Sequence, residues 1–316
     1  MTKKAVNWLF FIFLLVEFGT LAFIRLTGMK LGIIWGLILN QLIFFVPAVI
    51  FMAATKTGPG MVFAFKKLNP ATPFLCIVYT GLCMPLITVV NMISMLFVDN
   101  KANQLGAGLS GTPAWLMLLV IGLLGPANEE FIFRGIFYQS YRKIRGVIPA
   151  MLLSAFLFGI MHLNFNQMSY AIVVGILGVL LVEATGNTIC AMIFHICINT
   201  GNVIMMIMQQ DMLAATGGNS EALVQESLVQ LGLSYRQFML IAILMYGMIA
   251  LITGAMAMLL LFGISRIEKR SDDVAGIWKN RHRYPEGGKK VSLWSIPLIT
   301  AVVLSAVYMV VAIRMG

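Results

Sequence analysis

Nine stretches of about twenty mostly apolar residues, separated by short polar segments, restrict what this chain can fold into. A helix needs roughly twenty such residues to cross a bilayer, where every backbone polar group must be bonded within the protein. We therefore predict an all-α, polytopic transmembrane helical bundle of about nine spans, or eight if one of the two shortest stretches does not cross. The predicted spans are 5–24, 31–55, 73–98, 112–138, 147–163, 168–181, 187–208, 237–264 and 293–314, of which the fifth and sixth are the shortest.

The composition excludes a soluble globular protein. Sixty percent of the 316 residues are hydrophobic and only 11% are charged, whereas soluble domains carry about 25% charged residues. The net charge of +10 comes from short basic blocks between apolar runs, which indicates orientation in a lipid bilayer and not nucleic-acid binding. With a cytoplasmic N-terminus, alternating spans place sixteen of the 22 Lys and Arg residues inside and five outside, with Arg134 in the membrane.

Ionisable residues inside the fourth predicted span are the first indication of a functional site. A charged group at bilayer depth costs about 2.5 to 3.5 kcal/mol, so each one needs a partner or a purpose. Glu130 and Arg134 are four residues apart, in the favourable order for a helical ion pair. Glu129 lies about 100° around the helix without that partner, which favours a general base. Pro126 removes a backbone hydrogen bond, and we expect it to open the helix so that water reaches Glu129.

Two other predicted spans contribute histidines. His195 and Asn199 are also four residues apart, so both project from one helical face. Two adjacent neutral donors suit an oxyanion that develops in the transition state. His162, from a separate span, either helps Glu129 to activate a water molecule or ligates a metal.

Other polar residues in the spans have simpler interpretations. Glu17 and Glu183 lie near predicted span ends and are expected at the membrane interface. Asn40, Gln41 and Asn91 are expected to form hydrogen bonds between helices.

The motifs Glu-Glu-x-x-x-Arg, Phe-x-x-x-His and His-x-x-x-Asn, in this order, resemble those of the CPBP (ABI) family of intramembrane endopeptidases. That family includes the CAAX prenyl endopeptidases and bacterial relatives tied to bacteriocin immunity. The resemblance covers roughly residues 112 to 208, and the matching positions are Glu129, Glu130, Arg134, Phe158, His162, His195 and Asn199.

The resemblance implies that Glu129 and His162 activate water, that His195 and Asn199 form the oxyanion site, and that the remaining motif residues support them. It leaves two mechanisms open. In a metalloprotease, Zn²⁺ would be held by His162, His195 and Glu129. In a glutamate-type enzyme no metal is needed, and the chain has no HExxH pair on one helix that would decide between the two.

The function that follows is hydrolysis of a peptide bond in a membrane-associated protein or peptide. The alternative is a catalytically silent scaffold or bacteriocin-immunity factor that acts through a membrane protein partner. We expect the bacterial cytoplasmic membrane as the location. The predicted regions are N-terminal transmembrane helices (1–111), a catalytic core (112–208), an exterior loop (209–236) and C-terminal transmembrane helices (237–316) with a basic cytoplasmic linker (265–292).

Overall fold

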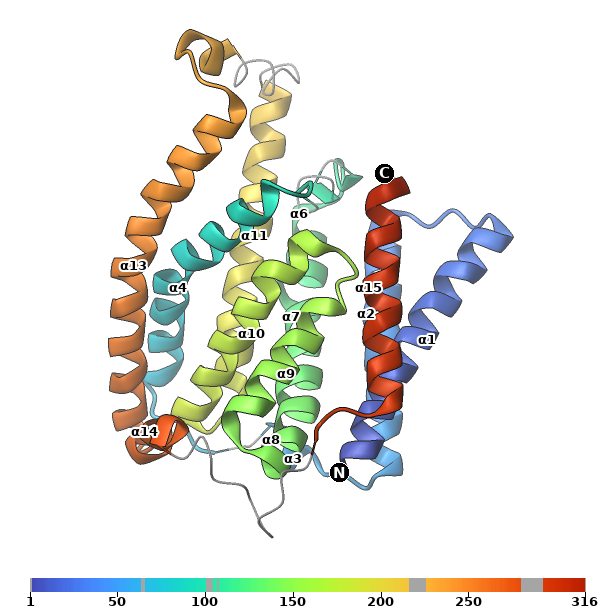
Figure 1. Cartoon of the computed structure of the whole chain (residues 1–316), viewed down its shortest axis with the longest axis vertical. Helices are drawn as coiled ribbons and strands as arrows, with labels where there is room; N and C mark the ends of the chain where they lie inside the picture. Colours follow the sequence, from blue (N-terminus) through green and yellow to red (C-terminus); the bar gives the residue numbers. More distant parts are fainter. Residues whose placement is uncertain are drawn as a thin grey trace.

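The computed structural model describes residues 2–63, 66–100, 105–106, 108–215, 226–279 and 292–315, and every regular element longer than a turn in these ranges is a helix (Figure 1). The elements are α1 (Lys3–Thr27), α2 (Ile33–Ala54), α3 (Pro59–Phe63), α4 (Thr72–Met95), α6 (Ala114–Met117), η1 (Leu118–Leu124), α7 (Gly125–Glu130), η2 (Phe131–Tyr138), α8 (Gln139–Arg145), α9 (Val147–Ile160), α10 (Phe165–Thr185), α11 (Thr188–Ala215), α13 (Tyr235–Ile267), α14 (Ser271–Lys279) and α15 (Ile296–Met315). The all-helical prediction is confirmed.

Eight helices in the described ranges are long and apolar enough to cross a membrane. The continuous run from α6 to α8, Ala114–Arg145, counts as one of them. Of the nine predicted spans, the fifth is too short to cross, because its helix α9 has only 14 residues. At 1.5 Å per residue it is about 21 Å long, less than the hydrocarbon core of about 30 Å. The sixth span is longer than predicted, since Asn164 caps α10 at its start and Gly186 ends it in a left-handed conformation.

The helices alternate in direction along the bundle (Figure 1). The N-terminus, α3, α8 and α14 lie at one end, and the C-terminus lies at the other. The last turn of α8 carries Arg142, Lys143 and Arg145, so these cations share an end with the N-terminus. This arrangement agrees with the positive-inside pattern that the sequence predicts.

Neither predicted polar connection is wholly a loop. Helix α11 continues to Ala215 and α13 begins at Tyr235, so both enter the predicted exterior loop at 209–236. Helix α13 ends at Ile267 and α14 follows, within the predicted linker at 265–292. Residues 216–225 of the loop and 280–291 of the linker lie outside the described residues.

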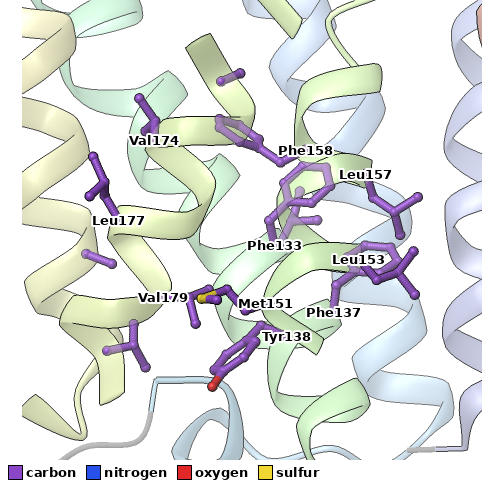
Figure 2. Packing of buried hydrophobic residues seen from close by; sticks show 14 of the residues in the cluster. Phe133, Phe137, Tyr138, Met151, Leu153, Leu157, Phe158, Val174, Leu177 and Val179 are labelled. Atoms are coloured by element: carbon purple, nitrogen blue, oxygen red, sulfur yellow. The ribbon is translucent and has the colours of Figure 1, made fainter. Parts of the chain in front are cut away.

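Buried side chains of η2, α9 and α10 pack together in the core of the bundle. Figure 2 shows aromatic side chains of η2 meeting Leu157 and Phe158 of α9, with Val174 and Val179 of α10 beside them. Glycines let α9 and α10 approach closely. A Cβ atom added at Gly175 would lie 2.7 Å from Cβ and 2.8 Å from Cα of Ala155. Because α9 ends inside the bundle, this packing fixes the depth of the loop that follows it.

We predict that Gly175→Ala destabilises the protein by about 1–3 kcal/mol, because the new methyl group meets backbone that cannot move aside. Thermal melting of the purified protein in detergent measures the loss. Gly247→Ala is the matched control, since an added Cβ there has no neighbour within 4 Å. Equal melting midpoints for the two variants would contradict the close α9–α10 packing.

Candidate active site

The two motif glutamates lie on a short α-helical segment with a wider helix on each side. Helix α7 ends at Glu130, and the π-helical segments η1 and η2 precede and follow it. The N–H of Gly125 bonds to the carbonyl of Val120, five residues back, just before Pro126. The helix is thus widened just before Pro126, and the expected access of water to Glu129 stays a prediction. The proline is accommodated by a wider turn, and such π-helical turns are frequent at functional sites.

Glu130 is bound by two partners from different helices. Its Oε2 lies 3.0 Å from Nε of Arg134, so the predicted ion pair is confirmed. Its Oε1 lies 2.8 Å from Nδ1 of His195 on α11. Glu130 and Arg134 are buried, with 0% and 1% of their side chains exposed. A carboxylate paired with Arg only accepts hydrogen bonds, so Nδ1 of His195 carries the proton of this bond.

Glu129 faces the other side of the His195 ring. Its Oε2 lies 3.7 Å from Nε2 of His195, and 26% of its side chain is exposed. With Nδ1 protonated towards Glu130, Nε2 of a neutral His195 is an acceptor. His195 can therefore donate to the neighbouring space from Nε2 only as the imidazolium, which differs from the predicted pair of neutral donors.

Phe158 on α9 lies between the three motifs. Its ring centroid is 4.5 Å from Cζ of Arg134, a cation–π distance. The same ring packs edge-on against His162 at 5.1 Å and His195 at 5.6 Å. His162 follows the end of α9, and its Nδ1 donates to the carbonyl of Phe158 at 2.9 Å. Nε2 of a neutral His162 is then the unprotonated nitrogen.

One cavity of about 910 Å³ joins these groups. Glu129, His162, His195 and Asn199 all line it. The structure thus brings together the four residues predicted to act in catalysis, and their roles stay predictions. The amide of Asn199 donates to the carbonyl of Ile121 at 3.3 Å, so it is held only by a long hydrogen bond.

The cavity extends from this centre towards the end of the bundle opposite the N-terminus. Its lining there includes Gly36 near the start of α2, Phe97 and Asp99 just after α4, and Ile313 near the end of α15. Figure 1 places these ends of α2, α4 and α15 on the side of the C-terminus. The cavity therefore leads from the motif residues towards that end of the bundle.

The predicted zinc ligands do not form a metal site in this arrangement. Zinc binds nitrogen and oxygen atoms at about 2.0–2.2 Å, so its ligands must lie close together. Among the described residues, no three His, Cys, Asp or Glu side chains are placed to hold a metal ion. The residues present do not fit a three-ligand zinc site.

Several interhelical contacts around the site connect it to helices outside the motifs. Asn128, next to Glu129, donates to Oε1 of Gln41 on α2 at 2.9 Å. Asn166, just after the His162 loop, donates to Oδ1 of Asn91 on α4 at 2.8 Å. The predicted interhelical hydrogen bonds of Gln41 and Asn91 are confirmed. Which helix each amide would meet could not be predicted from the sequence.

Glu183 lies near the end of α10, as predicted from the sequence. It is also buried within the protein, where it accepts hydrogen bonds from Tyr138 and Arg142. It therefore stabilises the contact between α10 and the α8 end of the fourth span.

One part of the chain resembles a known protein family. Residues 111–201 match the family model described as type II CAAX prenyl endopeptidase Rce1-like. This Rce1-like segment covers less than a third of the 316 residues and contains all seven motif positions. The match confirms the resemblance to the CPBP family of proteases. No curated protein and no solved structure was found to match the chain. The apolar helices and the Rce1-like segment together indicate an integral membrane protein.

We predict that Glu130→Gln lowers the stability by about 3–5 kcal/mol, because it leaves the buried guanidinium of Arg134 without its counter-charge. Melting in detergent measures this. Glu129→Gln is the matched control, since Glu129 is partly exposed and forms no ion pair with Lys or Arg among the described residues. A melting midpoint of Glu130→Gln equal to that of the control would contradict the shared role of Glu130.

Proposed function

We propose that the protein is an intramembrane endopeptidase that hydrolyses a peptide bond of a membrane-associated protein or peptide. The observation that carries the proposal is the 3.7 Å approach of Glu129 to His195, two residues of the Rce1-like segment, at the wall of the cavity. A carboxylate and an imidazole within reach of one water molecule are the groups that general acid–base hydrolysis needs.

In the proposed reaction Glu129 is the general base. The oxygen of a water molecule attacks the carbonyl carbon, and the proton that it loses passes to a carboxylate oxygen of Glu129. The unprotonated Nε2 of His162 helps to hold this water. When the C–N bond breaks, Glu129 returns the proton to the leaving nitrogen, so the products are a carboxylic acid and an amine.

The proposed oxyanion site consists of His195 and Asn199. Glu130 fixes the ring of His195 through Nδ1, and the Nε2–H of the imidazolium form can donate to the oxyanion. The amide of Asn199 carries two N–H groups, and the one that is not bonded to Ile121 supplies a second donor. Hydrogen bonds already oriented in a site shielded from water stabilise charge that appears only in the transition state.

This proposal uses no metal ion, because Glu129, His162 and His195 do not form a three-ligand site in this arrangement. It places the substrate on the side of the membrane opposite the N-terminus, where the cavity extends. With the N-terminus in the cytoplasm of a bacterium, that side is extracytoplasmic. A peptide exported through, or anchored in, the cytoplasmic membrane would then be the substrate.

We predict that Glu129→Gln lowers kcat for a cleaved peptide by a factor of about 10² to 10⁴, the usual contribution of a general base. The measurement is mass-spectrometric detection of cleavage products with purified protein in detergent. Asp272→Asn is the control and should leave the rate unchanged, because Asp272 is exposed on α14, at the opposite end of the bundle.

Unchanged turnover in Glu129→Gln would contradict the proposed base. If the Glu129→Gln variant also retained full function in cells, a non-catalytic scaffold or immunity factor would replace the peptidase.

A further inference from the structure

A second polar pair lines the cavity, away from the motif residues. It consists of Glu17 on α1 and Asn40 on α2, and Nδ2 of Asn40 donates to Oε2 of Glu17 at 3.2 Å. The predicted interfacial position of Glu17 is wrong. It lies near the middle of α1 (Lys3–Thr27), with its side chain turned into the cavity. Both residues lie outside the Rce1-like segment, so a shared family motif does not account for them.

The contacts of helix α2 show how deep in the membrane this pair lies relative to Glu129. Asn40 bonds to Glu17, and the next residue, Gln41, bonds to Asn128, which precedes Glu129. Consecutive residues of a helix differ by about 1.5 Å along its axis. Glu17 and the candidate base therefore lie at similar depths, on different walls of one cavity.

Glu17 has no cation of its own among the described residues. Among the described residues its side chain bonds to Asn40, and none of those that line the cavity is Lys or Arg. A carboxylate at bilayer depth is costly unless a cation accompanies it. The contact with Asn40 uses one oxygen of Glu17 and an N–H of the amide. Oε1 of Glu17 and the carbonyl oxygen of Asn40 remain as two acceptors for an incoming donor.

We propose that Glu17 and Asn40 form a specificity subsite for a cationic side chain, Lys or Arg, of the peptide substrate. The proposal rests on the proposed peptidase function. Helix α1 is connected to α7 through α2, so Glu17 and Glu129 lie at most about two helix spacings of 8–10 Å apart. An extended peptide advances about 3.3 Å per residue, so the cationic residue is expected within about six positions of the cleaved bond. The ammonium or guanidinium group donates to Glu17 and Asn40 and supplies the missing counter-charge.

Two small probes test the subsite directly. N-dodecanoyl-lysine amide and N-dodecanoyl-norleucine amide have the same carbon skeleton and differ only in the ε-ammonium group, which norleucine replaces with a hydrogen. Their affinities are measured by calorimetry with the full chain in an uncharged detergent. We expect the wild-type protein to bind the lysine probe about tenfold more tightly or better, because the bond joins two charged groups.

Glu17→Gln keeps the shape of the side chain and removes the charge, so the two probes should then bind equally. An unchanged affinity for the norleucine probe shows that the variant keeps its cavity. Glu129→Gln is the matched control, since it removes another carboxylate of the same cavity, and we expect the lysine preference to persist in it. The subsite is overturned if wild-type protein does not distinguish the probes, if Glu17→Gln keeps the preference, or if Glu129→Gln alone abolishes it.

Binding of the probes needs no cleavage, so this result is independent of the peptidase activity. A lysine preference in a protein that cleaves no peptide would retain the subsite and reject the proposed function. Cleavage with equal kcat/KM for matched lysine and norleucine peptides would retain the function and reject the subsite.

Discussion

The geometry of the candidate site depends on the two contacts that the carboxylate of Glu130 makes. This carboxylate is fully buried, and its two oxygens join Arg134 on its own helical span to His195 on α11. Breaking a buried pair leaves an unpaired charge that costs several kcal/mol, so this bridge holds the two spans in one register. Because Nδ1 of His195 is committed to Glu130, Nε2 is directed at Glu129, and the geometry of the proposed reaction follows from that single orientation.

Small and aromatic residues make room for this charged cluster in an apolar bundle. A Cβ atom added at Gly178 of α10 would lie 3.3 Å from Nε of Arg134, so the guanidinium occupies space that a larger residue would fill. The ring of Phe158 covers the guanidinium and contacts both histidines. The same short helix, α9, ends near the site and delivers His162. The length of α9 and its glycine contacts with α10 are thus part of the site's construction.

Sequence reasoning could predict features that depend on spacing along one helix. The apolar runs predict the spans, and the four-residue spacing predicts the Glu130–Arg134 pair. Features that depend on contacts between helices could not be predicted in this way. The second oxygen of Glu130 meets His195 only through the packing of α11, and Glu17 enters the cavity only because α1 and α2 lie beside the Rce1-like segment. The π-helical turns on either side of Pro126 could not be predicted either, because the spacing of apolar residues does not distinguish them from α-helix.

Whether Glu129 and His195 act together in cleavage is tested most directly by a double-mutant cycle. It compares the cleavage rates of Glu129→Gln, His195→Gln and the double variant. Groups that act as one unit lose most of their effect when either is removed. We expect each single variant to lower kcat/KM strongly and the double variant to lower it little further. If the two losses multiply, Glu129 and His195 act independently, and the account of a single cooperating pair held by Glu130 is wrong.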